Sequence, residues 1–126
     1  MDPELRKRLS KIFENCKNVD LLLLNNTEEQ DPNFRYLTRF KSGVFEDDFL
    51  IAKREGIELL TSELEYETAV AQRLEGMKIR KLTRANEKEI RKEMSEELNG
   101  KRIGINGRFM PVSTYLKLRK DYKPKK

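Results

Sequence analysis

Histidine is absent from the sequence, and cysteine occurs once, at Cys16. Without histidine the chain cannot form a Ser-His-Asp or Cys-His catalytic arrangement, and it lacks the commonest protein ligand of zinc. A single cysteine cannot form a disulfide within the chain, and no histidine is available to activate it, so we interpret Cys16 as a small core residue. A glycine-rich loop that could cradle phosphates is also missing. These absences argue against an independent α/β enzyme.

The sequence also contains no signal peptide and no apolar run long enough to cross a bilayer. Because an internal disulfide is excluded as well, we expect a cytoplasmic protein that does not contact a membrane. Lysine and glutamate dominate the charged residues and glutamine occurs only twice, which is typical of heat-stable proteins, although eight asparagines point the other way. With 126 residues, the chain has the size of one compact domain.

The first part of the chain has the pattern of a helix followed by a buried strand. Asp2-Pro3 is typical of a helix N-cap with proline in the first turn. Apolar residues then recur at helical spacing on one face, at Leu5, Leu9, Ile12, Phe13 and Cys16. The continuous apolar run from Val19 to Leu24 predicts a strand covered on both faces, ended by Asn25 and Asn26. The helix should therefore pack on the sheet that this strand enters.

The middle of the chain predicts a β-hairpin. Its strands would run from Val44 to Lys53 and from Ile57 to Ser62. The turn between them is Arg54-Glu55-Gly56, in which glycine supplies a positive backbone angle. We expect this hairpin to join a mixed sheet.

The remainder alternates between helix and strand patterns. The first predicted elements are a helix from Glu63 to about Arg73 that Gly76 ends, and a strand from Met77 to Leu82. A surface helix follows, capped by Thr83 or Asn86, with Ile90, Met94 and Leu98 inward and Gly100 as its stop. The prediction is completed by a strand from Lys101 to Ile105, a turn at Asn106-Gly107, and a helix from Ser113 to about Tyr122 that Pro124 closes. This alternation favours an α/β sheet with helices on both faces.

Three adjacent acids, Glu46-Asp47-Asp48, form the densest carboxylate cluster and could suggest a metal site or one acid of a ribonuclease-H-like nuclease. On a strand, Glu46 and Asp48 would share one face while Asp47 points to the other. A two-metal site would need two further acids on neighbouring strands, and the pattern supplies none. We therefore interpret the three acids as structural.

The net charge of +5 and a pI near 9.3 raise the possibility of nucleic-acid binding. Between Arg84 and Lys101, however, basic residues alternate with glutamates, which is the pattern of a solvated, ion-paired helix. The one dense basic run is Lys117 to Lys126, where Tyr115 and Tyr122 are interleaved with the charges. We interpret that run as a solvated face and linker, and keep a small basic nucleic-acid-binding module as the alternative function.

The most informative stretch runs from Asp31 to Phe40, where a turn-forming Asp-Pro-Asn leads into a dense aromatic cluster that predicts a packed corner. Together with segments before and after it, this stretch resembles the N-terminal domain of creatinase/prolidase-type peptidases. The other matching segments are Asp20 to Leu24, Phe49 to Ala52, Ile57 to Thr61, Leu64 to Ala69, Arg102 to Ile105 and Ser113 to Leu118. One departure is Arg39, which stands where the family usually has glycine.

The resemblance implies a single three-layer α/β domain over residues 1–122, with a mixed, ribonuclease-H-like sheet flanked by helices. Residues 123–126 would begin a linker to a catalytic domain that this chain lacks. In such peptidases that second domain has a pita-bread shape and binds two divalent metal ions through Asp, Glu and His residues. The resemblance therefore assigns no catalytic, cofactor-binding or metal-binding residue to this chain.

The function implied is that of a non-catalytic N-terminal domain of a proline dipeptidase or Xaa-Pro aminopeptidase. It would supply a wall of the substrate cleft and a dimerisation surface. The expected partners are the catalytic domain, a second subunit in a homodimer, and short Xaa-Pro peptides for the whole enzyme. The segment Lys41 to Asp47 would lie at the subunit interface near a neighbour's active-site mouth. The candidate interface and cleft residues are Arg39, Lys41, Phe45, Glu46 and Asp47.

Overall fold

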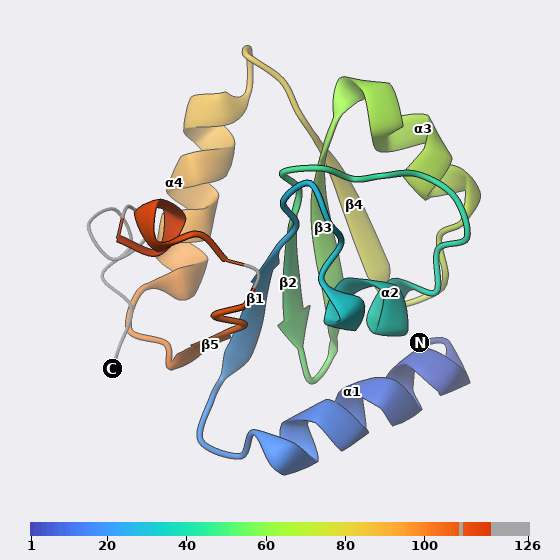
Figure 1. The fold of residues 1–126 in the computed structure, drawn as a ribbon, viewed down its shortest axis with the longest axis vertical. Coiled ribbons are helices and arrows are strands. Elements are labelled where there is room, and N and C mark those ends of the chain that lie inside the picture. Colours follow the sequence, from blue (N-terminus) through green and yellow to red (C-terminus); the bar gives the residue numbers. More distant parts are fainter. Residues whose placement is uncertain (109, 117–126) are drawn as a thin grey trace.

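The computed structural model describes residues 1–108 and 110–116 and centres on a five-stranded mixed sheet (Figure 1). In chain order the strands are β1 (Leu21–Asn25), β2 (Phe49–Lys53), β3 (Gly56–Ser62), β4 (Met77–Leu82) and β5 (Ile103–Ile105). They lie side by side in the order β4-β3-β2-β1-β5. The first three form an antiparallel meander, whereas β4 is parallel to β3 and β5 is parallel to β1.

Helices cover both faces of the sheet (Figure 1). The helices α1 (Pro3–Asn15), α2 (Pro32–Thr38) and α3 (Glu63–Ala71) pack on one face, and α4 (Glu87–Leu98) packs on the other. Since neighbouring strand residues point to opposite faces, Leu22 and Leu24 of β1 face α1, while Leu21 and Leu23 face α4. The α/β fold with a mixed sheet between helix layers is thus confirmed. None of the described helices is both long and apolar enough to span a membrane.

The first helix begins and packs as its sequence predicts. The Asp2 carboxylate accepts a hydrogen bond from the Leu5 amide at 3.0 Å, and Pro3 occupies the first turn. Leu5, Leu9 and Phe13 are buried against the sheet. Cys16, predicted as a core residue, is instead half-buried at the C-cap. The helix has ended there, so the Cys16 side chain lies at the edge of the buried face.

The aromatic stretch forms a packed corner, and part of it is the short helix α2. The Asp31 carboxylate caps this helix by accepting a hydrogen bond from the Asn33 amide at 2.9 Å. The rings of Phe34, Phe40 and Phe45 are buried together, with centroids between 5.3 and 6.3 Å apart. Phe45, which comes from the following segment, therefore completes the aromatic cluster.

The hairpin is shorter than predicted, because β2 begins at Phe49 and not at Val44. Phe45 and Asp47 have φ angles of 51° and 62°, in the left-handed region that interrupts a strand. The expectation that Glu46 and Asp48 share a strand face is therefore wrong. The turn itself is as predicted, and Gly56 is needed there for space, since a Cβ would lie 2.6 Å from the Gly76 carbonyl oxygen.

The second half of the chain follows its periodicity closely. Both β4 and the inward face of α4 lie where the sequence predicts them, with the inward face buried. Thr83 and Asn86 share the start of α4, because the Thr83 hydroxyl accepts from the Asn86 amide and the Asn86 side chain accepts from the Thr83 amide. Leu64, near the start of α3, is 94% exposed. Residues 112–116 are helical, and the rest of the predicted last helix and linker lies outside the described residues.

Candidate functional site

The segment predicted to lie at an interface is residues 41–47. We call this segment, together with Asp48 that follows it, the strap. It crosses the α3 side of the domain without joining the sheet (Figure 1). Gln72, just after α3, holds its beginning: the side-chain oxygen accepts from the Lys41 and Ser42 amides at 2.6 and 3.2 Å. Glu65 of α3 holds its middle, because one carboxylate oxygen accepts from the Val44 and Phe45 amides, both at 2.9 Å.

Two side chains that follow β1 hold the strap from its other side. The Gln30 amide group donates to the Gly43 and Val44 carbonyls, both at 2.9 Å. The Asn26 amide group donates to the Phe45 carbonyl at 3.2 Å. These bonds satisfy backbone groups that a strand would pair with its neighbours. The strap is therefore fixed by distant side chains and has no regular secondary structure of its own.

Phe45 anchors the strap through its side chain, which is fully buried in the aromatic cluster. Gly43 makes room for that ring, since a Cβ at this position would lie 2.4 Å from the Phe45 ring. Gly43 also has a φ of 103°, which disfavours any other residue. The Phe45 ring itself thus lies inside the domain.

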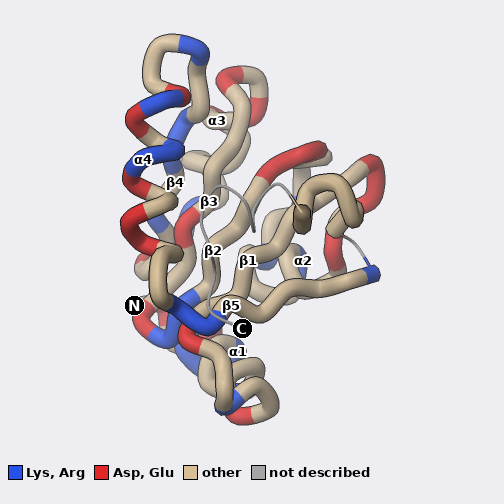
Figure 2. The backbone as a smooth tube through the Cα atoms, turned by 90° about the vertical axis from the view of Figure 1, so that its left-hand side faces the viewer, with Lys and Arg blue, Asp and Glu red and all other residues tan. Residues whose placement is uncertain are grey.

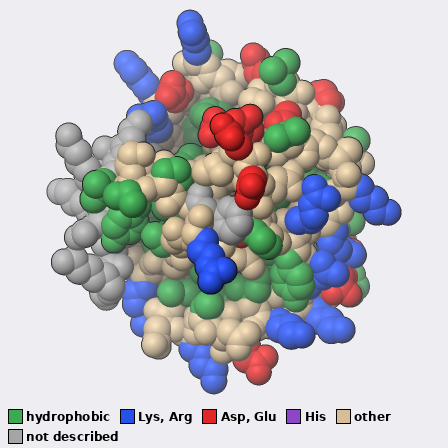
Figure 3. Space-filling model, in the orientation of Figure 1, with side chains coloured by type: hydrophobic (Ala, Val, Ile, Leu, Met, Phe, Trp, Pro, Cys, Tyr) green, Lys and Arg blue, Asp and Glu red, His purple; other side chains and the backbone are tan. Residues whose placement is uncertain are grey.

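The remaining candidate residues are exposed, apart from half-buried Arg39. Lys41, Glu46 and Asp47 are exposed, and so is Val44 beside them. Figure 3 shows acidic side chains gathered over the part of this face where the strap reaches β2 in Figure 1. The outward surface of the strap therefore combines an acidic pair with one basic and one apolar side chain.

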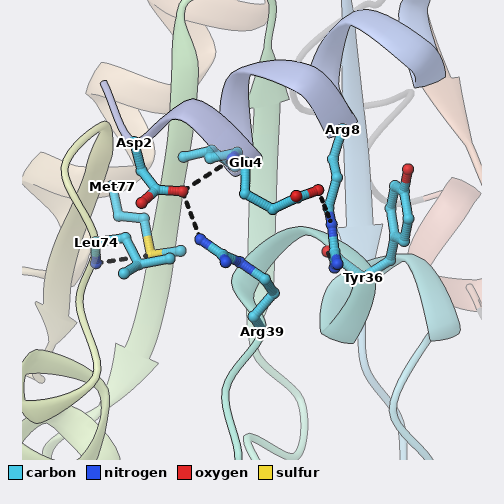
Figure 4. A network of polar contacts seen from close by, with 8 residues as sticks. Asp2, Glu4, Arg8, Tyr36, Arg39, Leu74 and Met77 are labelled. Atoms are coloured by element: carbon cyan, nitrogen blue, oxygen red, sulfur yellow. Dashed lines mark hydrogen bonds and ion pairs between the residues drawn. The ribbon is translucent and has the colours of Figure 1, made fainter.

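Arg39 is half-buried and helps to place the strap. It is the C-cap of α2 with φ 55° and ψ 25°, a left-handed conformation in which glycine is favoured. Its guanidinium group forms an ion pair with the Asp2 carboxylate at the start of α1 (Figure 4). The ion pair gives this arginine a structural role that glycine could not have.

A second arginine connects the same two helices in the opposite direction (Figure 4). Arg8 of α1 donates to the Tyr36 carbonyl of α2 at 2.6 Å, and its guanidinium carbon lies 4.8 Å from the centre of the Tyr36 ring. It also donates to Glu4 at 2.9 Å, and this bond holds the pKa of the Glu4 carboxyl below its usual range. Arg8 and Arg39 together hold α2, and with it the beginning of the strap, against α1.

Two asparagines that sequence reasoning treated only as the end of a strand are buried parts of this site. The Asn25 side chain and the Asn26 amide both donate to the Asp48 carbonyl, at 3.2 and 3.0 Å. Asn26 also accepts from the Asp31 amide at 2.9 Å. These bonds connect the end of β1 to the last residue of the strap and to the cap of α2. An asparagine pair directly after an apolar strand was the signal available in the sequence.

Asp48 is the other residue that sequence reasoning did not single out. Its side chain is only 5% exposed, although the acids before it, Glu46 and Asp47, lie at the surface. Burial raises the pKa of Asp48 to about 7; the Thr61 hydroxyl and Ser62 amide oppose this rise, and the Glu65 and Asp47 carboxylates add to it. The strap therefore ends in a carboxyl group that titrates near neutral pH.

No reactive cluster accompanies these groups in the described part of the chain. Among those residues, no group of three or more Cys, Asp or Glu side chains could hold a metal ion. Cys16 lies in a surface hollow of about 380 Å³. The hollow is lined by the Asn15, Asn33 and Asn106 amides and by Ile12, Leu22, Leu24 and Ile105. That lining offers Cys16 no base.

Comparison with known proteins decides the family. The sequence profile of the creatinase/prolidase N-terminal domain matches residues 6–126, nearly the whole chain. The chain belongs to this family. The resemblance read from the aromatic stretch and its neighbouring segments is thereby confirmed. No curated protein sequence matches the chain.

Solved structures of this family share the fold. An Xaa-Pro dipeptidase from Bacillus anthracis is 20% identical with a TM-score of 0.69, over 97% of this chain and 32% of that protein. An X-Pro aminopeptidase from Thermotoga maritima is 15% identical with a TM-score of 0.72, over 96% and 32%. The isolated creatinase/prolidase N-terminal domain of a Streptococcus pyogenes X-Pro dipeptidase is 14% identical with a TM-score of 0.69, over 99% and 92%. This chain thus spans about a third of the two longer proteins.

Proposed function

We propose that this chain is the non-catalytic N-terminal domain of a cytoplasmic proline dipeptidase or Xaa-Pro aminopeptidase. The observation that carries the proposal is the family match over residues 6–126, since the domain's fold recurs as about a third of a dipeptidase and of an aminopeptidase. Two divalent metal ions and the peptide-bond chemistry would belong to a catalytic domain that this chain does not contain. Residues 123–126 would begin the linker to that domain.

The domain would contribute a wall of the substrate cleft and a dimerisation surface. The strap supports this role, because it carries exposed Lys41, Val44, Glu46 and Asp47 on a segment held in place at both ends. Half-buried Arg39 and buried Phe45 would act indirectly, by fixing where the strap lies. A wall that narrows the cleft would restrict substrates to short Xaa-Pro peptides.

The nucleic-acid alternative gains no support from the charge distribution. Lysines and arginines alternate with acids along α4 and leave no continuous basic stripe there (Figure 2). Arg91 pairs with Glu87 on this helix, and Glu93 pairs with Arg80 of β4. Charges neutralised in this way make few phosphate contacts. The basic run from Lys117 onward lies outside the described residues.

The first test is activity of the chain alone. Purified protein incubated with Xaa-Pro dipeptides and added cobalt or manganese should show no hydrolysis, because the metal-binding domain would be missing. The measurement is release of free proline. Metal-dependent turnover that follows the protein through repeated purification would contradict the proposal.

The second test asks whether the strap reaches the cleft. A chimera would carry this chain in place of the N-terminal domain of the Bacillus anthracis Xaa-Pro dipeptidase. In an active chimera, Glu46→Lys with Asp47→Lys should raise KM or dissociate the dimer. Glu96→Lys, on the exposed side of α4, is the matched control and should do neither. Equal kinetics and equal oligomeric state in all three chimeras would exclude the cleft and dimer roles.

A further inference from the structure

The side chain of Asp48 occupies an unusual position at the end of the strap. Its backbone is fixed from β1, where Asn25 and Asn26 donate to its carbonyl, and from the strap, where its amide donates to the Phe45 carbonyl at 3.2 Å. The antiparallel register pairs Phe49 with Leu60, so the residue opposite Asp48 on β3 is Thr61. A buried carboxyl group therefore faces a buried hydroxyl group.

Both groups have an unused polar atom. Within the described residues, neither Oδ2 of Asp48 nor Oγ1 of Thr61 has a hydrogen-bond partner of good geometry, and both atoms are buried. An ionised carboxylate is costly to bury, and the Thr61 hydroxyl and the Ser62 amide offset that cost only in part, since burial still raises the pKa of Asp48. A protonated carboxyl group can donate one hydrogen and carries no charge. The site thus fits the protonated form of Asp48 better than the ionised form.

In the described part of the chain, two acidic side chains raise the pKa of Asp48. Glu65 faces it from α3 and Asp47 from the strap, while β1 presents neutral Asn25 and Asn26, and β3 presents neutral Thr61 and Ser62. Glu65 is also the side chain that holds the Val44 and Phe45 amides. Ionisation of Asp48 would therefore place a second negative charge near the carboxylate on which the strap depends.

We propose that Asp48 is a proton-operated latch, which holds the strap against the domain while it is protonated and loosens the strap when it ionises. Ionisation of Asp48 would weaken two sets of contacts. One is the pair of hydrogen bonds that the Val44 and Phe45 amides donate to Glu65, and the other is the packing of Asp48 against Thr61. The raised pKa of Asp48 puts the change near neutral pH. The backbone of Phe45 and Asp47 is left-handed, so the strap has no helix or strand hydrogen bonds that could hold it once these contacts weaken.

The consequence for an enzyme rests on the function proposed above, because only then would the strap border a substrate cleft or a subunit interface. The latch itself is a property of this chain. It is therefore tested on the chain alone, without metal, peptide or catalytic domain. If the strap of the chain responds to pH as proposed but no active chimera forms, this inference is supported and the proposed function is contradicted.

The experiment is hydrogen exchange of the strap amides by NMR between pH 5.5 and 8.5, corrected for the intrinsic pH dependence of exchange. The protection factors of the Val44 and Phe45 amides should fall at least about tenfold as Asp48 ionises. Asp48→Asn should keep them high throughout, since an amide can donate to Thr61 and carries no charge. The matched control Glu46→Gln, on the exposed part of the strap, should behave as the unaltered chain does. The amides of Ile51 and Leu59, inside the sheet, report whether any loss is global.

Two results would overturn the latch. One is an Asp48 side-chain carbon resonance in the unaltered chain that titrates near pH 4, a measurement that stands even if Asp48→Asn fails to fold. The other is an equal loss of strap protection with pH in the unaltered chain and in Asp48→Asn. A loss that Ile51 and Leu59 share in full would likewise count against it, because the domain as a whole would then be opening.

Discussion

The strap and α4 lie over opposite faces of the sheet and are stabilised by different forces. α4 buries three apolar side chains one turn apart, Ile90, Met94 and Leu98, and several of its charged side chains form ion pairs. The strap buries a single ring, Phe45, and depends on side chains of other elements for its backbone hydrogen bonds. The position of α4 thus depends on a repeated apolar pattern within its own sequence, whereas that of the strap depends on individual contacts with residues of other elements.

The two regions should also respond to pH in opposite directions. A hydrogen bond from Arg80 holds the pKa of Glu93 on α4 below its usual range, so its contribution to stability is lost as the pH falls through that lowered pKa. Burial raises the pKa of Asp48 from its usual 3.8 to about 7. The folded state therefore holds this proton more tightly than the unfolded chain does. The stability from Asp48 is present below pH 4 and is lost as the pH rises through 7.

The largest expected effect comes from removing the anchor of the strap. Phe45→Ala should lower the free energy of unfolding by roughly 3 to 5 kcal/mol, because it empties a closely packed aromatic cluster. Phe34→Ala and Phe40→Ala should cost similar amounts. Urea unfolding followed by circular dichroism measures the change. Asp47→Ala is the control at an exposed strap position and should cost far less.

A Phe45→Ala loss no larger than that of Asp47→Ala would mean that the ring is not part of the core in solution. Leu98→Ala extends the comparison to the other face. It should cost roughly 2 to 5 kcal/mol, the usual range for a buried leucine, yet leave exchange of the strap amides unchanged in the folded state. Loss of strap protection in Leu98→Ala would show that the two faces are coupled.

The next effect is the pH dependence of stability. A difference of about three pKa units between the folded and unfolded chain corresponds to at most about 4 kcal/mol, and partial access of solvent to Asp48 reduces this figure. Between pH 4 and 8, the free energy of unfolding should fall as the pH rises. Asp48→Asn should flatten that slope and be more stable than the unaltered chain at pH 8. Parallel curves for the two proteins would show that Asp48 ionises freely in the folded state.

The smallest effect concerns Arg39 at the C-cap of α2. Arg39→Ala keeps the left-handed backbone and loses the ion pair with Asp2, so it should be destabilised. Arg39→Gly loses the same ion pair but relieves the backbone, and should be more stable than Arg39→Ala by about 1 kcal/mol. Thermal unfolding of the two variants side by side measures this. Identical melting temperatures would mean that the left-handed conformation carries no cost at this position.

Sequence alone predicted the elements that depend on their own periodicity. Apolar spacing located α1 and α4, the buried run located β1, and alternation located β4, in each case within two residues of the observed bounds. The order of matching segments predicted the family and the fold class. These features are encoded locally, or in the order of local patterns, so a single sequence contains them.

The strap could not be predicted in the same way. Its conformation depends on Glu65 and Gln72, which lie some 20 and 30 residues further along the chain, and on a ring that turns inward from a left-handed backbone. Three adjacent acids gave no sign that Asp48 alone would be buried. The sequence therefore named the candidate residues without separating half-buried Arg39 and buried Phe45 from exposed Lys41, Glu46 and Asp47. Their role at an interface stays a prediction.

The close approach of Gly56 and Gly76 restricts how relatives of this chain can diverge. The Gly76 carbonyl accepts from the Ile57 amide at 3.0 Å and fills the space that a side chain at position 56 would need. A side chain is disfavoured at position 76 as well, because the backbone there has a φ of 102° and a Cβ would lie 2.6 Å from the Met1 side chain. Gly56 cannot be replaced while the segment of Gly76 keeps its path. A relative with a side chain at position 56 should therefore carry a displaced segment before β4.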